Sequence, residues 1–407
     1  MNYGLLGQKL AHSYSPLIHQ QLGDYPYELF EVEPDQLSDF LAQPFEGLNV
    51  TIPYKQSVMS YCHQLSEAAK AIGSVNTLIR QHDGTLYGDN TDVAGFWQML
   101  VTANICVAGK KVLVLGSGGS SLTVCHVLKR EGADQVIVVS RRGPTTYDNL
   151  NKYLDSQVIV NTTPVGMYPN NGQSPLSLQR FGQLEAVVDL IYNPNKTALL
   201  LEADQLSIPA VGGLGMLVGQ AVAASTLFTG KTDFNVREFV STIQKTTLNL
   251  VLVGMPGSGK TTIATALGML TGREVIDTDA EIIKKAKKSI PDIFEASGEA
   301  HFRELESAVI ADVGKNSGKI ISTGGGCVTT LGNFDLLRQN GIVVFLTRNV
   351  AELSRQDRPL STGDLDTLYQ QRLPLYEAIA DKQVSNTGLV EDVAKKVWEA
   401  FNEAVDY

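Results

Sequence analysis

The chain of 407 residues is long enough for several domains, and 43% of its residues are hydrophobic and 19% charged. This composition is typical of a globular protein and excludes a largely disordered one. The formal net charge of −10 is shared about equally by the parts before and after Lys245, so neither half resembles a basic nucleic-acid-binding arm, and we expect no nucleic-acid partner.

The first 100 residues contain short apolar segments that alternate with helical patterns. The apolar segments are "MNYGLLG", "YELFEV", "FEGLNVTIP" and "SVNTLIR", and each is typical of a β-strand. We therefore expect a separate α/β domain at the start of the chain.

Polar residues cluster around these predicted strands. They lie in "HSYSP", "NVTIPYK", "SVNT" and "GDNTD", and they are Ser13, Ser15, Thr51, Lys55, Asn76 and Asp92. Each one alone could be an ordinary turn or cap residue. Together they offer hydroxyls and amides for a polyhydroxylated acid, and a Lys/Asp pair for proton transfer.

The segment "KVLVLGSGGSS" predicts a buried strand, a glycine turn and the start of a helix. Gly116, Gly118 and Ser121 occupy the G-x-G-x-x-G/A pattern, with serine in the last place. Glycines there let backbone amides approach a pyrophosphate at a helix N-terminus. By itself this pattern is weak evidence for a dinucleotide, because glycine turns between strands and helices are common.

The end of the next predicted strand adds a second signal. "QVIVVSRR" finishes with Ser140, Arg141 and Arg142, where an NAD site would have an acidic residue. Arginines at this position favour the 2′-phosphate of NADP. Two ordinary surface arginines are the alternative interpretation.

Residues 1 to about 243 resemble shikimate dehydrogenase in the order and spacing of their motifs. The motifs are "SYSP", "NVTIPYK", "GSVNT", "GDNTD", "GSGGSS", "NTTPVGM", "DLIYNP" and "GGLGMLVGQA". The family often has N-R-T-x-x-R after the second strand of its cofactor domain, whereas this chain has "SRRGPT". The resemblance implies NADPH-dependent reduction of 3-dehydroshikimate to shikimate.

The same resemblance implies roles for individual residues. Ser13 and Ser15 would bind the substrate carboxylate, and Lys55 with Asp92 would serve proton transfer while NADPH delivers hydride. The ring hydroxyls and oxygens would contact Thr51, Asn76, Asp92, Tyr192 and Gln220. NADP(H) would lie along Gly116, Ser117, Gly118, Gly119, Ser120, Ser140, Arg141, Arg142, Leu190 and Gly213.

Two further helices are predicted before the chain enters its second half. "GMLVGQAVAASTLFTG" ends at Gly230, and "DFNVREFVSTI" begins with Asn235 as N-cap and Glu238 three residues later. The polar segment "QKTTLN" is then predicted to be a linker to the next strand. It is short and has no Pro or Gly/Ser tether, so we expect it to hold the halves close.

The segment "NLVLVGMPGSGKTTIATALG" has the full G-x-x-x-x-G-K-[ST] pattern in Gly254, Gly259, Lys260 and Thr261. It lies between a predicted strand and a predicted helix, which is the context that a P-loop requires. Lys260 would reach the β/γ-phosphates of ATP, and Thr261 would ligate Mg²⁺. The residues expected around ATP are Gly257, Ser258, Gly259, Lys260, Thr261 and Thr262.

Two carboxylates follow the next predicted strand in "VIDTDAEI", namely Asp277 and Asp279. Acidic helix caps are common there, but a carboxylate beside a P-loop can also organise Mg²⁺ or accept a hydroxyl proton. Together with "GEAHFRELE", "STGGGCV", "RQDRPL" and "QRLPLYEAIAD", these residues resemble shikimate kinase over about residues 248–407.

By this second resemblance, Asp279 would bind the acceptor and act as its base, and Asp277 would support Mg²⁺. Arg303 and Arg372 would hold the substrate carboxylate, for which the guanidinium fork is suited. Arg358 would approach ATP from a mobile lid. The substrate ring would lie along Gly324, Gly325 and Gly326.

The expected fold class is α/β: an α/β substrate domain and a Rossmann-type NADP domain, followed by a P-loop kinase domain with a parallel sheet. Residues 1–245 would form the dehydrogenase half, with a substrate lobe (1–100 and 216–245) and a Rossmann lobe (101–215), and residues 246–407 the kinase half. The hypothesis is a bifunctional enzyme of aromatic amino acid (chorismate) biosynthesis that reduces 3-dehydroshikimate and then phosphorylates shikimate to shikimate 3-phosphate. The alternatives are a quinate/shikimate dehydrogenase fused to a kinase, and a catalytically retired ligand sensor.

The cysteines Cys62, Cys106, Cys125 and Cys327 form no C-x-x-C pair and fit a reducing compartment. The first residues lack a signal-peptide pattern, and no stretch approaches the ~20 apolar residues of a membrane span. We therefore expect a cytoplasmic protein without membrane contact. Its expected partners are the small-molecule substrates, and a homodimer is compatible with the sequence.

Overall fold

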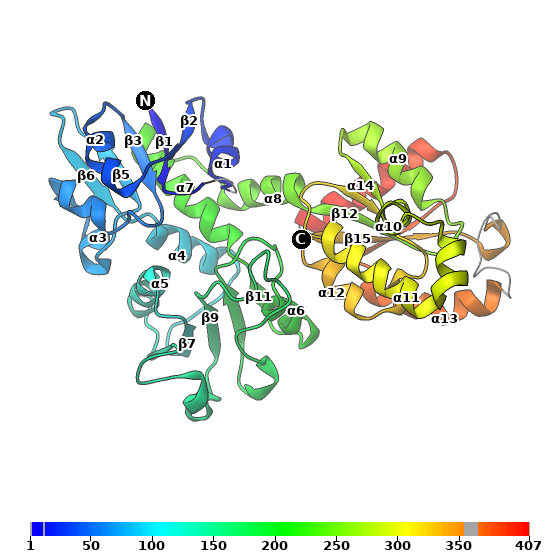
Figure 1. The fold of residues 1–407 in the computed structure, drawn as a ribbon. Coiled ribbons are helices and arrows are strands. Elements are labelled where there is room, and N and C mark those ends of the chain that lie inside the picture. The colour runs from blue at the N-terminus through cyan, green and yellow to red at the C-terminus, as the bar shows by residue number, and fades with distance from the viewer. Residues whose placement is uncertain (1, 11–12, 354–364, 407) are drawn as a thin grey trace. The chain divides into compact units, whose positions relative to one another are not determined.

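The computed structural model describes residues 2–10, 13–353 and 365–406, and Arg358 lies outside this described part. The chain divides into two compact units (Figure 1). The first unit comprises Met1–Met167, Gln173–Tyr192 and Glu202–Ile243. The second comprises Tyr168–Gly172, Asn193–Leu201 and Gln244–Tyr407.

The first unit begins with a mixed sheet of strand order β2-β1-β3-β5-β6-β4. β1 pairs in parallel with β2 and β3, whereas β5 runs antiparallel to β3 and β6. A turn at Gly84 with φ +85° joins β5 to β6 as a hairpin. The strands are β1 (Tyr3–Gly7), β2 (Tyr27–Glu31), β3 (Gly47–Val50), β4 (Gln64–Leu65), β5 (Thr77–Arg80) and β6 (Leu86–Asp89).

The second sheet of this unit is parallel throughout, with the strand order β11-β10-β9-β7-β8. This is a doubly wound sheet whose order reverses between β7 and β9, the position at which such folds bind nucleotides. Its central strands are fully buried, as continuous apolar runs predict. The strands are β7 (Lys111–Leu115), β8 (Gln135–Val139), β9 (Val158–Asn161), β10 (Ala186–Asp189) and β11 (Ala210–Val211).

The helices of this part of the chain are α1 (Ser15–Leu22), α2 (Leu37–Ala42), α3 (Glu67–Ile72), α4 (Asp92–Thr102), α5 (Gly119–Arg130), α6 (Ala198–Gln205), α7 (Leu214–Thr229) and α8 (Val236–Thr247). α7 ends at Gly230 in the left-handed conformation, as predicted. The start of α8 is also as predicted, since the Glu238 amide donates to Asn235 Oδ1 at 3.4 Å.

The end of α8 differs from the sequence interpretation. The helix continues to Thr247, so most of the expected polar link is helical. The reason is local, because no Gly or Pro lies between Val236 and Thr247 to end the helix. The chain passes from the first unit to the second for the last time within this helix, between Ile243 and Gln244.

The second unit is built on a parallel sheet of strand order β13-β14-β12-β15-β16. The strands are β12 (Asn249–Val253), β13 (Val275–Asp277), β14 (Ile320–Ser322), β15 (Gly341–Thr347) and β16 (Lys382–Ser385), and the helices are α9 (Lys260–Thr271), α10 (Thr278–Ala286), α11 (Ile290–Val313), α12 (Gly332–Arg338), α13 (Leu365–Ile379) and α14 (Val390–Asp406). None of the described helices of the chain has the length and apolar character needed to cross a membrane.

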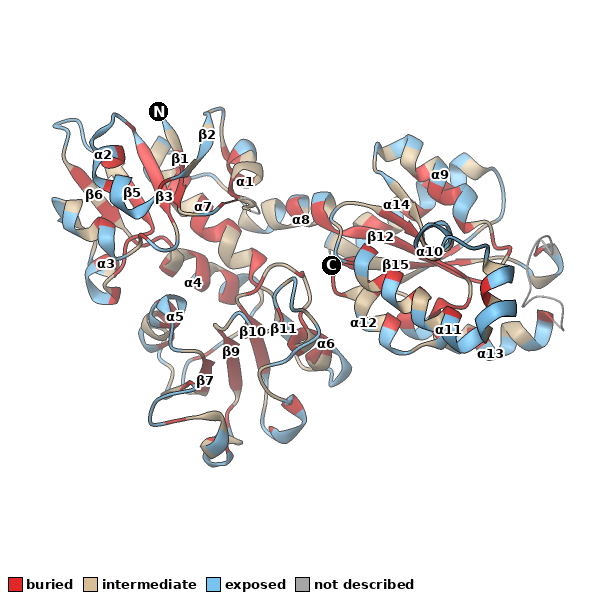
Figure 2. Ribbon diagram, viewed as in Figure 1, coloured by how far each residue is buried: buried red, intermediate tan, exposed pale blue. Residues whose placement is uncertain are grey.

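Each face of this sheet is covered by its own apolar core. Val251 and Val253 of β12 belong to one core cluster, whereas Leu250 and Leu252 belong to the other, because successive side chains of a strand point to opposite faces. Figure 2 shows the buried residues concentrated in these central strands. The expected α/β folds, Rossmann-like and P-loop, are confirmed.

Candidate active sites

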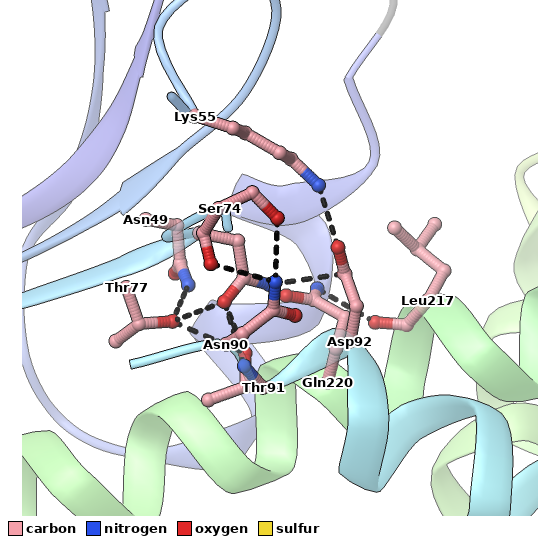
Figure 3. A network of polar contacts seen from close by, with 10 residues as sticks. Asn49, Lys55, Ser74, Thr77, Asn90, Thr91, Asp92, Leu217 and Gln220 are labelled. Carbon is pink, nitrogen blue, oxygen red and sulfur yellow. Dashed lines mark hydrogen bonds and ion pairs between the residues drawn. The ribbon is translucent and has the colours of Figure 1, made fainter. Parts of the chain in front are cut away.

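Lys55 and Asp92 form an ion pair in the first unit, with 2.6 Å between Lys55 Nζ and Asp92 Oδ2 (Figure 3). Asp92 is the first residue of α4, and its other oxygen accepts a hydrogen bond from Asn76 Nδ2 at 2.9 Å. Lys55 lies in the loop that follows β3. The side chains are 32% (Lys55) and 15% (Asp92) exposed, so the pair is partly desolvated but remains accessible to a ligand.

The pair lies in a cavity of about 590 Å³. Hydroxyl, amide and charged groups converge there beside apolar side chains such as Leu5 and Leu10, which suits a small polar ligand. The cavity brings together eleven of the predicted residues of this half, namely Ser13, Ser15, Thr51, Lys55, Asn76, Asp92, Ser120, Leu190, Tyr192, Gly213 and Gln220.

Tyr192 contributes a hydrogen-bonding group to the same cavity. Burial raises the pKa of Tyr192 above its usual value, and nearby Tyr14 adds to this rise. The two rings lie 5.3 Å apart between centroids. Tyr192 is therefore uncharged at neutral pH and can donate a hydrogen bond to a ligand oxygen.

The glycine turn after β7 leads directly into α5, whose first residue is Gly119. Gly116 has φ +105°, and a Cβ there would lie 2.7 Å from Thr162 Oγ1. The exposed Arg141 and Arg142 follow the neighbouring strand β8. β7 and β8 run in parallel, so the turn and the arginines lie at the same carboxyl edge of the sheet. This arrangement fits a dinucleotide with a 2′-phosphate.

In the second unit, the P-loop joins β12 to α9. Lys260 is buried, and its Nζ donates to the carbonyls of Gly254 and Met255 at 2.8 and 3.0 Å. Thr261 Oγ1 donates to Asp277 Oδ2 at 3.0 Å. A hydroxyl beside a carboxylate matches the oxygen ligands that Mg²⁺ prefers, so Thr261 and Asp277 fit this metal.

The P-loop borders a cavity of about 490 Å³. Eleven of its lining residues were predicted to contact ATP, Mg²⁺ or the acceptor, besides Lys260: Gly257, Gly259, Thr261, Thr262, Asp277, Asp279, Arg303, Gly324, Gly325, Gly326 and Arg372. The predicted Ser258 is fully buried, and its carbonyl accepts from Asn386 Nδ2 at 2.6 Å.

The glycine triplet after β14 makes room for charged groups in this cavity. A Cβ on Gly324 would lie 2.7 Å from Asp279 Oδ1, and one on Gly326 would lie 2.4 Å from the Arg303 guanidinium nitrogens. Arg372 Nη1 donates to the Gly325 carbonyl at 3.1 Å. Glycine is thus required for the close approach of a carboxylate and a guanidinium to this turn.

Asn49 and Glu306 line these cavities but were not among the predicted site residues. Asn49 lines the first cavity and lies in β3, two positions before Thr51, which follows the end of this strand. Glu306 lines the second and accepts from Arg303 Nη1 at 2.7 Å. Burial raises the pKa of the Glu306 carboxyl, and the charge of Arg303 opposes this rise. The i, i+3 spacing from Arg303 was the signal that could have revealed Glu306.

Two family models match the chain. The model of the shikimate dehydrogenase substrate binding domain matches residues 5–78, and the shikimate kinase model matches residues 256–402. Among curated relatives, the NADP⁺-dependent shikimate dehydrogenase of Caldanaerobacter subterraneus subsp. tengcongensis is 36% identical over 266 residues, covering 58% of this chain and 94% of the relative. The same enzyme of Clostridium beijerinckii is 36% identical over 247 residues, or 56% and 91% of the two chains.

Solved structures agree with these matches. A chorismate mutase/shikimate 5-dehydrogenase fusion protein from Clostridium acetobutylicum is 38% identical with a TM-score of 0.56, covering 59% of this chain and 96% of that one. Shikimate 5-dehydrogenase from Thermus thermophilus, solved with NADP(H) and shikimate, is 31% identical with a TM-score of 0.54, covering 59% and 97%. Quinate dehydrogenase from Corynebacterium glutamicum, solved with NAD, is 27% identical with a TM-score of 0.55, covering 60% and 98%.

Proposed function

The chain belongs to the shikimate dehydrogenase family in its N-terminal part and carries a shikimate kinase domain in its C-terminal part, and from this premise we propose which steps it performs. The first unit reduces 3-dehydroshikimate to shikimate with NADPH. The second phosphorylates the 3-hydroxyl of shikimate with Mg·ATP. The observation that carries this proposal is the presence of two cavities. One is bordered by the P-loop, and the other by Ser120, which follows the glycine turn at Gly116. Each cavity also contains groups suited to a small hydroxylated carboxylic acid.

In the reduction, bound NADPH supplies the hydride to the carbonyl carbon. Lys55 donates the proton that the developing alkoxide needs, and Asp92 orients Lys55 through their ion pair. Ser13 and Ser15, which line the same cavity, bind the substrate carboxylate. Thr51, Asn76, Tyr192 and Gln220 would hold the ring oxygens and so fix the orientation of the substrate in the cavity.

In the phosphorylation, Mg·ATP supplies the phosphoryl group. Asp279 accepts the proton of the substrate hydroxyl, and Lys260 stabilises the charge on the phosphates. Thr261 and Asp277 hold the metal. Arg303 and Arg372 bind the substrate carboxylate, and Gly324, Gly325 and Gly326 leave space for the ring.

Shikimate alone can test both activities, because it is the product of one reaction and the substrate of the other. The purified chain should form NADPH from shikimate and NADP⁺, and it should form ADP from shikimate and Mg·ATP. Failure of either half-reaction would remove that half from the proposal.

Quinate dehydrogenase fused to a kinase is the second candidate, and the similarity to the quinate enzyme of Corynebacterium glutamicum favours it. The exposed Arg141 and Arg142 after β8 favour NADP and therefore the first candidate. Initial rates with shikimate and quinate, each with NADP⁺ and NAD⁺, separate the two. We expect the highest kcat/KM for shikimate with NADP⁺, and a preference for quinate with NAD⁺ would support the second candidate.

The domain limits and the location are also proposed here. We place the dehydrogenase half at residues 1–245 and the kinase half at 246–407, supported by the change of compact unit between Ile243 and Gln244. A cytoplasmic location is supported by the four cysteines, all of which are free thiols. A retired ligand sensor is disfavoured because the predicted proton-transfer groups line the cavities.

A further inference from the structure

Polar side chains form a continuous hydrogen-bonded series from the half-buried Tyr27 on β2 to Asn49 and Asn76, which line the first cavity. Tyr27 OH donates to Asn49 Oδ1 at 2.8 Å, and Asn49 Nδ2 donates to Thr77 Oγ1 at 3.2 Å. Thr77 Oγ1 in turn donates to Asn76 Oδ1 at 3.1 Å. Figure 3 shows the bond between Asn49 and Thr77 within the polar network that also contains the Lys55–Asp92 ion pair. Asn49, Thr77 and Asn76 are all buried.

The donors and acceptors of this series can be assigned by starting at Asn76. The backbone N–H of Thr91 donates to Asn76 Oδ1 at 2.7 Å, so this atom must be the carbonyl oxygen, and the Asn76 amino group faces Asp92. A hydroxyl has only one hydrogen. Thr77 Oγ1 donates to Asn76 Oδ1 and lies 3.1 Å from Thr91 Oγ1 as well, and it accepts from Asn49 Nδ2.

Asn49 completes this series. Its amino group faces Thr77, and its carbonyl faces Tyr27, which acts as the donor. One hydrogen of the Asn49 amino group remains for other partners. Because Asn49 lines the cavity, this hydrogen is the one with which Asn49 can bind a ligand oxygen.

Tyr27 also packs against a neighbouring aromatic ring. The His19 ring stacks on Tyr27 with centroids 3.8 Å apart and an angle of 7°, and His19 Nδ1 lies 2.7 Å from Tyr25 OH. Burial raises the pKa of Tyr27 well above its usual value, and a hydrogen bond from Ser15 acts in the opposite direction. Tyr27 therefore keeps its proton and remains a donor throughout the neutral range.

We propose that Tyr27 is a positioning residue of the dehydrogenase site, which holds the Asn49 amide so that it meets the substrate as a hydrogen-bond donor. This inference rests on the proposed reduction of 3-dehydroshikimate. Tyr27 does not touch the substrate in this account and acts through Asn49. Losing its hydroxyl frees the amide to rotate and to present its carbonyl to substrate oxygens.

The test compares Tyr27→Phe, Asn49→Ala and the double variant in the full chain, with Tyr3→Phe as a matched control. Tyr27→Phe keeps the ring stacked on His19 and removes one hydroxyl. Tyr3→Phe removes a hydroxyl that donates to the Phe228 carbonyl at 3.2 Å, in the same unit. Dehydrogenase kcat and KM for shikimate with NADP⁺, the rate of phosphorylation and the melting temperature are measured for each.

For Tyr27→Phe we expect KM for shikimate to rise about tenfold and kcat to change less than about twofold. The reason is that the Asn49 amide would no longer be held in the orientation that binds the substrate. In the Asn49→Ala background the same change should have no further effect on KM, because the two residues act as one unit. An unchanged KM in Tyr27→Phe, additive effects in the double variant, or an equal KM rise in Tyr3→Phe would each overturn the inference. An unmodified chain that does not oxidise shikimate would instead show that the proposed function itself is wrong.

Discussion

Gly95 on α4 lies directly against Gly219 on α7: a Cβ placed on Gly219 would be only 3.0 Å from the Gly95 Cα. The two helices can approach this closely because neither residue has a side chain at the contact. α4 begins with Asp92, and α7 contains Gln220. These two residues line the first cavity. The helix crossing therefore sets the distance between Asp92, which is paired with Lys55, and the predicted substrate contact Gln220.

Gly95→Ala should disrupt this crossing. The alanine Cβ would lie 2.5 Å from the Met216 carbonyl oxygen and 2.8 Å from the Gln220 backbone nitrogen. Backbone atoms of a helix cannot move aside easily. We expect the first unit to lose about 1–3 kcal/mol of stability and most of its dehydrogenase activity. Thermal unfolding and shikimate oxidation measure both effects. Gly182→Ala, where a Cβ meets no atom within 4 Å, is the control, and equal losses in both variants would contradict this view of the crossing.

The two activities should be separable by single substitutions. Lys55→Ala removes the cation paired with Asp92 and should lower the dehydrogenase kcat by about 10²–10⁴-fold, with phosphorylation unchanged. Lys260→Ala removes the P-loop cation and should abolish phosphorylation with oxidation unchanged. Both rates are measured on the same preparation of each variant. Loss of both activities in either variant would show that the sites are not independent.

Asp277→Asn should separate metal binding from helix capping. Asp277 Oδ1 accepts from the amides of Asp279 and Ala280 at 3.0 and 3.2 Å, and asparagine caps helices about as well as aspartate. The variant should therefore keep its melting temperature while its kinase requires about tenfold more Mg²⁺, since a carboxylate ligand is lost.

A titration of the kinase rate with Mg²⁺ at saturating ATP measures this requirement. Asp292→Asn serves as the control, because Asp292 also lies in the first turn of a helix, α11, but is absent from the lining of the cavity among the described residues. An unchanged Mg²⁺ requirement in Asp277→Asn would remove this residue from the metal site.

His19 should make the first unit sensitive to acid. Burial lowers the pKa of His19 from 6.5 to about 3, and a hydrogen bond with Asn49 acts in the opposite direction. Between these two pH values the unfolded chain binds a proton at His19 that the folded chain does not. The stabilisation is therefore complete above about pH 6.5 and decreases by about 1.4 kcal/mol per pH unit as the pH falls toward 3.

Urea unfolding at a series of pH values between about 4 and 7 measures this slope. The chain has two tryptophans, so the change Trp398→Phe leaves Trp97 as the reporter of the first unit. In that background the free energy of unfolding of His19→Gln should depend less steeply on pH. In His82→Gln, at an exposed position, this dependence should be unchanged. The same slope in all three proteins would refute the assignment to His19.

Local patterns predicted much of both candidate sites. The P-loop and the glycine turn at Gly116 were identifiable because each depends on a short spacing of residues after a predicted strand. The helix boundaries at Gly230 and Asn235 were likewise set by their own cap residues. These features depend on nearby residues in the sequence, which is why the sequence could indicate them.

Features that depend on packing were not predictable in the same way. Asn49 lines the first cavity because β3 pairs with β1 and β5 and holds its side chain between Tyr27 and Thr77. Glu306 is buried against Arg303, although glutamates on helices are usually exposed. The close helix contact at Gly95 and Gly219 joins residues far apart in the chain, and neither glycine occupies a turn.

The most direct test of the account gives the purified full chain 3-dehydroshikimate and analyses the products by mass spectrometry. With NADPH and Mg·ATP together, we predict shikimate 3-phosphate as the final product. With NADPH alone the product should stop at shikimate, and with Mg·ATP alone no phosphorylated acid should form. A phosphorylated product without NADPH, or shikimate that accumulates unphosphorylated when both cofactors are present, would contradict two consecutive reactions on one acid by one chain.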